Sequence, residues 1–283
     1  MKPAPFRLER VRSVDECLDA LTGDDVKVIA GGQSLIPLMA LRLADPRLLV
    51  DVNGVTGLDG VAMSGGYLYL GSLVRHTRLA TDERIGGMLP LLREAASHIG
   101  HVAIRNRGTL GGSLAHADAA AELPAAMVLL GATMVCVARR GGRREIPAAE
   151  FFVGPYTTAL RDDELLAGVR VPVPAADVRF GFVEFAPRHG DFARAGCACA
   201  VEVDEGGRLA GLRAVVFAVT SCPVDVARGA ALPFGEPVGD VDWRGLARAL
   251  TEDVRASAGD EHRARLAPVA VERAIRQAIG GVA

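Results

Sequence analysis

The sequence predicts an α+β protein built from three segments, and three observations support this prediction. Short apolar β-type runs alternate with helical stretches over the first half of the chain. Two prolines then stiffen the chain at Val171–Pro174, and beyond them two long β-runs precede two helical stretches. Because 283 residues exceed the usual length of one domain, we expect domains at residues 1–56, 57–174 and 175–283.

The first expected domain is a small α+β unit. Ser13 precedes an apolar-periodic stretch, where its hydroxyl is suited to cap a helix. The predicted elements are a helix at Ser13–Leu21, a strand at Lys27–Ala30, a helix at Leu35–Leu43 and a strand at Leu48–Val52.

The second and third expected domains differ in the order of their elements. In the second domain, strands flank two helices, whereas in the third domain the strands come first. The predicted strands are Tyr67–Leu70, Thr133–Val137, Ala195–Val203 and Leu212–Ala218, and the predicted helices are Leu89–Ile99, Ala119–Leu130, Trp243–Ser257 and Val269–Ile279. An exposed loop is expected at Gly235–Gly239, within the segment Leu232–Asp240.

Composition argues against several classes of function. The net charge is only -2 and arginines are scattered among acidic residues, so nucleic-acid binding has little electrostatic support. No apolar run approaches the roughly 18 residues that span a bilayer, and residues 1–12 lack the apolar region of an export signal. We therefore expect a cytoplasmic protein without membrane insertion, whose partners are small molecules or proteins.

The five cysteines show no spacing suited to a metal centre. They include no CxxC pair and no four-thiolate pattern for an iron-sulfur cluster, so we expect any cluster to belong to another chain. Cys197 and Cys199 alternate with Ala198 in an apolar run and are predicted to point to one face of a strand as buried, inert thiols.

A first glycine segment, Ala30–Ser34, lies in KVIAGGQSLIPLMALRL. The β-run stops at two glycines and a helix follows, with Ser34 able to cap it. Glycines let backbone approach a ligand closely, and free N–H groups at a helix start attract a pyrophosphate. An ordinary tight turn also accounts for this pattern, and neither GxGxxG nor GxxxxGK is present.

A second glycine segment, Thr109–Ser113, lies in IRNRGTLGGSLAHADAAAELPA. Glycines again permit close approach to a phosphate, and a helix is expected to begin near Asp118, which can cap it. Glu122 then falls in the first turn, where a carboxylate suits the helix dipole. We expect a side chain at Gly32 or Gly111 to occupy the space that a phosphate needs.

Together these two stretches resemble the medium, FAD-binding subunit of molybdenum hydroxylases, the carbon monoxide dehydrogenase and xanthine dehydrogenase family. Further similarity runs through LVDVNGV, LGSLVRHTRL, FFVGPYTTALRDDELLAGVRVP and GDFARAG. The resemblance implies a vanillyl-alcohol-oxidase-type FAD-binding fold with two α+β subdomains, noncovalent FAD between them, and a smaller C-terminal sheet-plus-helices domain.

The resemblance also implies which residues meet the cofactor. Two five-residue runs line the pyrophosphate, Glu122 meets hydroxyls of FAD, and Leu166 contacts the flavin, with plain core packing as the alternative for Leu166. The implied cofactor-binding residues are Ala30, Gly31, Gly32, Gln33, Ser34, Thr109, Leu110, Gly111, Gly112, Ser113, Glu122 and Leu166.

Two departures from the family pattern stand out. Glu184 occupies a position where some relatives carry a lysine that touches the flavin, so that role is not carried over. The stretch from Val216 to Ala231 replaces a glycine-rich one, which bears on subunit contacts or C-terminal packing.

The family resemblance implies an electron relay. A molybdenum-cofactor large subunit oxidises the substrate, a small subunit carries two [2Fe-2S] clusters, and the flavin of this chain passes electrons to NAD, oxygen or another acceptor. Neither a metal nor a catalytic residue is expected in the chain itself. The alternative is a standalone FAD-dependent oxidase or dehydrogenase on the same scaffold, which the departure at Val216–Ala231 leaves open.

Overall fold

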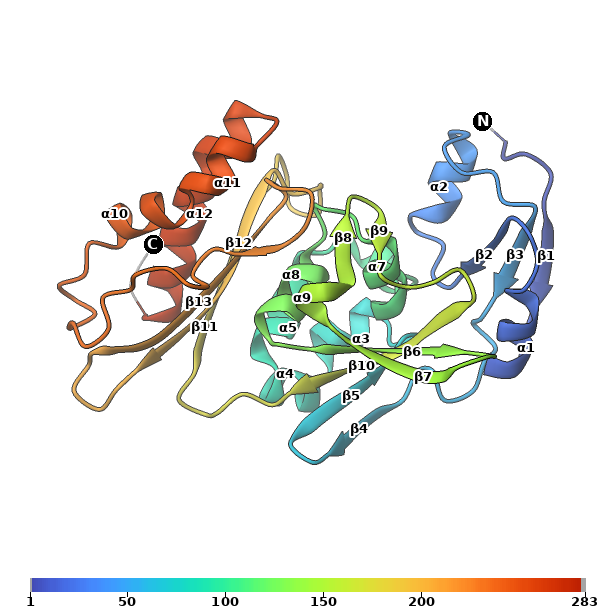
Figure 1. Ribbon diagram of the computed structural model, residues 1–283, viewed down its shortest axis with the longest axis horizontal. Coiled ribbons are helices and arrows are strands. Elements are labelled where there is room, and N and C mark those ends of the chain that lie inside the picture. The colour runs from blue at the N-terminus through green and yellow to red at the C-terminus, as the bar shows by residue number, and fades with distance from the viewer. Residues whose placement is uncertain (1, 281–283) are drawn as a thin grey trace.

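The computed structural model describes residues 2–280 and has an elongated shape (Figure 1). A small sheet near the N-terminus forms one end, a larger sheet with its helices forms the middle, and a third sheet backed by helices forms the other end. Strands and helices are mixed throughout, as the sequence predicts. The boundaries after residues 56 and 174 stay a prediction.

The N-terminal sheet is parallel and has the strand order β1-β3-β2. Ser13 caps the first helix as expected, because its hydroxyl accepts from the Glu16 N–H at 3.1 Å. The second helix ends earlier than predicted, since Arg42 turns the backbone left-handed (φ 62°). The elements are β1 (Arg7–Arg10), α1 (Val14–Ala20), β2 (Val26–Ile29), α2 (Leu35–Ala40) and β3 (Leu48–Asp51).

The middle sheet is antiparallel, with the order β4-β5-β10-β6-β7. Helices cover one of its faces, and their buried side chains form the largest apolar core. The elements are β4 (Val61–Ser64), β5 (Tyr67–Gly71), α3 (His76–Thr81), α4 (Glu83–Met88), α5 (Pro90–His98), α6 (Val102–Arg105), α7 (Leu110–His116), α8 (Glu122–Leu129), β6 (Thr133–Ala138), β7 (Gly142–Pro147), α9 (Ala148–Phe151), β8 (Phe152–Gly154), β9 (Thr157–Thr158) and β10 (Glu164–Pro172).

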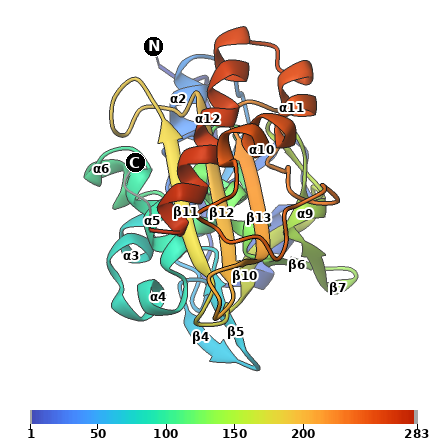
Figure 2. The same ribbon diagram turned by 90° about the vertical axis from the view of Figure 1, so that its left-hand side faces the viewer.

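The third sheet is antiparallel, with the order β11-β12-β13-β14, and lies between two layers of helices. α10 and α12 cover its outer face (Figure 2), and α5 and α8 of the middle part cover the other. Phe182 and Phe217 stack at 5.6 Å on that inner face and extend the middle core into this sheet. The elements are β11 (Arg179–Phe185), β12 (Ala195–Val203), β13 (Leu209–Phe217), β14 (Val224–Asp225), α10 (Trp243–Leu250), α11 (Glu252–Ser257) and α12 (Glu261–Ala278).

The thiols of β12 are buried on one face, as predicted. Cys197 and Cys199 both join the core under α12, while Ala198 between them joins the core under α8. Burial raises the pKa of Cys199 to about 12 and that of Cys197 well above its ordinary value. Both thiols therefore stay protonated and unreactive at neutral pH.

Other predicted helix boundaries were also wrong, and α12 begins at Glu261, well before the predicted start at Val269. α8 begins at Glu122 instead of near Asp118, because the Asp118 carboxylate accepts from the Ala120 N–H at 2.9 Å and closes a turn before the helix. The helix predicted at Trp243–Ser257 divides at Thr251, which lies outside the helical region (φ -102°, ψ 9°).

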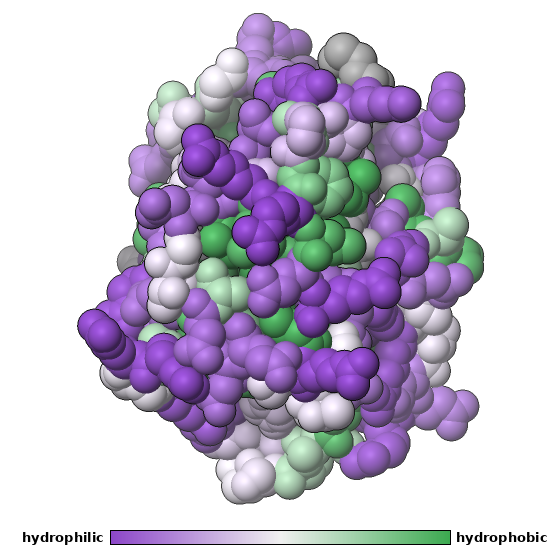
Figure 3. Space-filling model, turned by 90° about the vertical axis from the view of Figure 1, so that its right-hand side faces the viewer, coloured by the Kyte–Doolittle hydropathy of each residue, from purple (hydrophilic) through white to green (hydrophobic). Residues whose placement is uncertain are grey.

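None of the helices within residues 2–280 combines the length and the apolar character that crossing a bilayer requires. The face at the N-terminal end shows apolar side chains gathered among hydrophilic ones (Figure 3). Exposed apolar side chains of the N-terminal segment include Phe6, Leu8, Leu41 and Leu43. An apolar area of this kind is typical of a surface that another protein covers.

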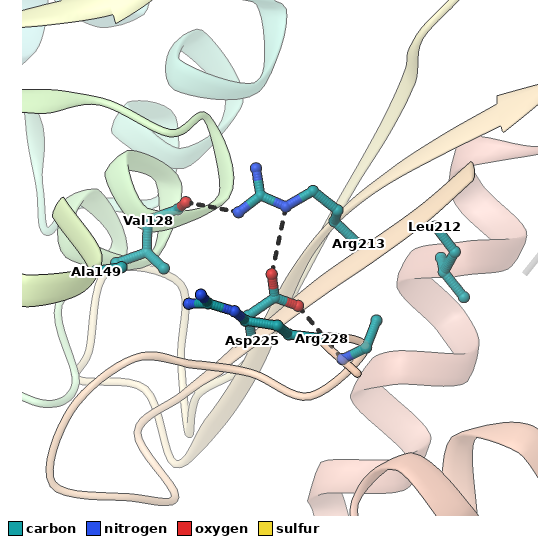
Figure 4. A pocket seen from close by; sticks show the side chains of 7 residues that line it. Val128, Ala149, Leu212, Arg213, Asp225 and Arg228 are labelled. Atoms are coloured by element: carbon teal, nitrogen blue, oxygen red, sulfur yellow. Dashed lines mark hydrogen bonds and ion pairs between the residues drawn. The ribbon is translucent and has the colours of Figure 1, made fainter. Parts of the chain in front are cut away.

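Arg213 of β13 joins the third sheet to the middle part. Its guanidinium donates to the Val128 carbonyl at the end of α8 (3.0 Å) and pairs with Asp225 (3.3 Å), as Figure 4 shows. These residues border a hollow of about 350 Å³, none of whose lining residues belongs to a glycine segment. The divergent stretch Val216–Ala231 supplies part of this lining, including Arg228.

A buried carboxylate in β10 gives a test of the middle fold. The side chain of Glu164 is fully buried and meets Arg144 (2.7 Å) and Arg161 (3.0 Å), which lower its pKa although burial alone raises it. We expect Glu164→Gln to reduce the free energy of unfolding by about 2 kcal/mol, since both arginines are partly exposed. Urea denaturation at pH 7 measures the change.

The control is Glu145→Gln, because Glu145 also pairs with two arginines but lies at the surface. It should cost less than about 1 kcal/mol. Equal losses in the two variants would contradict a stabilising role that depends on the burial of Glu164.

Candidate functional site

The first glycine segment runs from the end of β2 to the start of α2. Gly32 has a positive φ of 72°, and the Gln33 amide donates to the Gly31 carbonyl at 3.1 Å. Within the described chain, the N–H groups of residues 31–34 donate no hydrogen bond. Ser34 precedes α2 as predicted, but its side chain makes no capping bond, so that prediction was wrong. The segment therefore presents unused donors, as an anion site requires.

The second glycine segment differs from the predicted loop, because it is the first turn of α7. Thr109 caps that helix and accepts from the Gly112 N–H at 3.1 Å. The Leu110 and Gly111 N–H groups donate to the carbonyls of Val74 and Ser72, both at 2.8 Å. These backbone donors and the Thr109 hydroxyl are already used, so the Ser113 hydroxyl is the free side-chain polar group of this segment within the described chain.

The structure brings Gly31 of the first segment against Arg107 and Gly108, the two residues that lead into the second segment. A Cβ on Gly31 would lie 2.3 Å from the Arg107 carbonyl oxygen and 2.9 Å from the Gly108 Cα. No real side chain fits at these distances, and the obstacle is backbone, which cannot rotate away. Glycine at position 31 therefore permits the two chain segments to touch.

Gly32 and Gly111 also have structural reasons within the chain to be glycine. A Cβ on Gly111 would lie 2.4 Å from the Ser72 Cβ, so this glycine allows α7 to pack against the turn after β5. A Cβ on Gly32 would face Ile36 at 3.3 Å, and the positive φ is the stronger constraint. Side chains at these positions would therefore displace the segments, and their obstruction of a phosphate stays a prediction.

His76 holds the backbone at the start of the second segment in place. The sequence did not reveal this role. Its buried ring contacts the Thr109 carbonyl through Nε2 at 2.9 Å, and its backbone N–H donates to the Gly108 carbonyl at 3.1 Å. Burial lowers its pKa to about 4, so the ring is neutral and Nε2 carries the proton. The sequence signal for this role was the position of His76 in LGSLVRHTRL, one of the stretches with family similarity.

Glu122 begins α8 and lies close to a second acidic side chain. It is buried, and burial together with the charge of Glu184 raises its pKa to about 8. Glu184 lies on β11, where burial raises its pKa to about 7 against the lowering effect of His98. Its Oε2 is buried without a partner in the described chain. At neutral pH Glu122 is therefore protonated and able to donate a hydrogen bond.

Leu166 is buried in β10, opposite Cys136 of β6, and belongs to the core of the middle part. Packing alone accounts for its burial. Its contact with the flavin stays a prediction.

Arg105 and Arg107, which flank Asn106 before the second segment, have different surroundings. The Arg105 guanidinium donates to the carbonyls of Ile99 (3.0 Å) and Gly100 (2.8 Å) at the end of α5. The Arg107 side chain is exposed and forms no ion pair with a described residue. Arg107 is therefore the one of the two that is free to meet an anion.

Comparison with known proteins identifies the family of this chain. Residues 4–174 match the family described as the FAD binding domain in molybdopterin dehydrogenase. The caffeine dehydrogenase subunit beta of Pseudomonas sp. (strain CBB1) is 37% identical over 286 residues, which is 98% of this chain and 96% of that protein. The chain belongs to this family.

Other relatives agree with the assignment. The carbon monoxide dehydrogenase medium chain of Hydrogenophaga pseudoflava is 33% identical, covering 86% of this chain and 93% of that one. A chain of quinoline 2-oxidoreductase from Pseudomonas putida 86 superposes with a TM-score of 0.90 at 37% identity, over 99% of both chains. The protein is an FAD-binding oxidoreductase, a medium subunit of the molybdenum hydroxylase type, and the predicted fold is confirmed.

The contact at Gly31 gives the first test of the site. We expect Gly31→Val to lower FAD affinity about 100-fold, because separating the segments should cost about 3 kcal/mol. Fluorescence titration of the deflavinated chain with FAD measures the affinity, and circular dichroism checks folding. Gly87→Ala is the control, since a Cβ there meets nothing within 4 Å. Wild-type affinity in a folded Gly31→Val protein would contradict the contact.

The raised pKa of Glu122 predicts how stability without FAD depends on pH. The folded chain holds this proton more tightly than the unfolded one, so the contribution is present at low pH and is lost as pH rises from about 4.5 to about 8. Relative to wild type, Glu122→Gln should therefore gain stability over that interval. Urea denaturation at several pH values measures the difference, with exposed Glu150→Gln as the control. A difference that does not change with pH would contradict the raised pKa.

Proposed function

We propose that this chain holds FAD between its two glycine segments and relays electrons from iron-sulfur clusters of a partner subunit to an acceptor. The observation that carries the proposal is the contact of the two segments at Gly31 in a chain of the FAD-binding family. Bound FAD supplies a centre that exchanges electrons singly or in pairs. The protein binds and positions this cofactor.

The two segments have different proposed tasks. The free N–H groups of residues 31–34 suit the pyrophosphate, and Arg107 beside them adds a positive charge. The hydroxyl of Ser113 suits a further polar group of the cofactor, while that of Thr109 holds the helix start. The proposed binding residues are Ala30, Gly31, Gly32, Gln33, Ser34, Thr109, Leu110, Gly111, Gly112 and Ser113, with Glu122 and Leu166 added from the family resemblance.

Glu122 is proposed to hold hydroxyl groups of FAD. Protonated at neutral pH, its carboxyl both donates and accepts a hydrogen bond, as a hydroxyl partner requires. Burial contributes most to this raised pKa, and Glu184 adds to it because a second carboxylate nearby disfavours ionisation of the first. The acid at position 184, where some relatives have lysine, thereby acquires a proposed electrostatic role.

The proposed partners are a molybdenum-cofactor large subunit and a small iron-sulfur subunit. The relatives are named as a subunit beta and a medium chain, which supports assembly with other chains. The apolar face near the N-terminus offers a surface for such a contact (Figure 3). We leave the acceptor open, since NAD gains no support from these names. Cytoplasmic location stays a prediction.

The purified protein should be yellow and release FAD intact on mild denaturation, because the proposed contacts are noncovalent. Absorbance near 450 nm, about where oxidised flavins absorb, and chromatography of the released cofactor provide the measurement. Colourless protein that does not take up FAD on reconstitution would contradict the proposal.

Purification from the native host separates the relay from the standalone alternative. Copurifying chains that carry molybdenum and iron would support the relay. A yellow chain that purifies alone and oxidises a small substrate would favour a standalone oxidase or dehydrogenase.

A further inference from the structure

Asn53, in the turn after β3, is hydrogen-bonded to the first glycine segment. Its Nδ2 donates to the Ala30 carbonyl at 2.8 Å and to Asp51 Oδ1 at 2.6 Å. The Asn53 backbone N–H also donates to Asp51 Oδ1, at 3.0 Å. The amide is therefore held in one orientation, with its oxygen directed away from Ala30.

Arg75, just before α3, continues this chain of hydrogen bonds to the second segment. Its Nη2 donates to Asn53 Oδ1 at 2.7 Å, and its Nη1 donates to the Arg107 carbonyl. The backbone of Arg75 also bridges to that of Thr109. One planar guanidinium thus faces the first segment through Asn53 and the second segment directly.

The two ends of this series of hydrogen bonds lie next to the contact at Gly31. Ala30 directly precedes Gly31, and the Arg107 carbonyl is the group that a Cβ on Gly31 would strike. Steric contact prevents the segments from moving closer but does not prevent their separation. Hydrogen bonds through Asn53 and Arg75 oppose separation, so the two effects together define one distance.

Such a link is needed because the segments rest on different cores. Ala30 packs against the N-terminal core, whereas Leu110 belongs to the core of the middle helices. A relative shift of the two cores would widen the site. A cofactor that contacts both segments binds more tightly when their separation is fixed beforehand.

We propose that Asn53 and Arg75 form a clamp, a hydrogen-bonded link from the Ala30 carbonyl to the Arg107 carbonyl, which sets the separation of the two glycine segments and thereby FAD affinity. Both are positioning residues that act through the backbone of the segments. The inference rests on the proposed FAD site and adds residues that determine its geometry.

The alternative is that Arg75 acts only by its positive charge on the pyrophosphate. Arg75→Lys separates the two, since lysine keeps the charge but cannot reach both Asn53 and Arg107 with a planar fork. Asn53→Asp makes a second distinction, because it is nearly isosteric and keeps the acceptor for Arg75 but loses the donor to Ala30.

FAD titration of the deflavinated full-length chain tests the clamp. We expect Asn53→Ala, Asn53→Asp, Arg75→Ala and Arg75→Lys each to weaken FAD binding about 10-fold or more. The Asn53→Ala, Arg75→Ala double variant should lose no more than the worse single variant, because either change breaks the same link. Melting temperatures without FAD should shift by no more than about 4 °C.

The matched control is Arg10→Ala, since exposed Arg10 pairs with the same Asp51 (3.6 Å) but does not reach a glycine segment. It should bind FAD like wild type. Wild-type affinity in Asn53→Asp or Arg75→Lys, or additive losses in the double variant, would overturn the clamp. A wild-type chain that does not bind FAD would instead overturn the proposed function.

Discussion

The close approach of Gly31 to the Arg107 carbonyl is the contact on which the site depends. Position 31 tolerates no Cβ, because the obstacle is the backbone of the other segment. This contact holds the end of β2 against the entry to α7, so the N-terminal sheet and the middle helices meet there. The free N–H groups of residues 31–34 consequently lie beside the second segment.

The two segments differ in what secures them. The second is locked by His76, Ser72 and the Thr109 cap, and its backbone donors are already used. The first keeps its donors free and depends on neighbouring residues for its position. A fixed second segment opposite a first segment with free N–H donors suits preorganised binding of a phosphate. The third sheet contributes Glu184 to the site, and the charge of Glu184 adds to the effect of burial in raising the pKa of Glu122.

The sequence predicted several buried elements but missed the buried central strand β10, and it predicted the contacts between elements poorly. β12 and α1 follow from apolar pattern and capping, whereas β1 is exposed along its length and has no such pattern. Both glycine segments were found from sequence, but α7 was missed because two glycines weaken helix propensity. Pairings such as Gly31 with Arg107 join distant parts of the chain, and local patterns do not encode them.

Hydrogen exchange of the full-length chain, with and without FAD, tests most directly whether the cofactor binds at the first glycine segment. We expect FAD to slow amide exchange most at residues 31–34, because their N–H groups have no partner in the described chain. Residues 110–113 should change little, since their amides are already bonded. Unchanged exchange at residues 31–34, with protection only elsewhere, would contradict a pyrophosphate site at the first glycine segment.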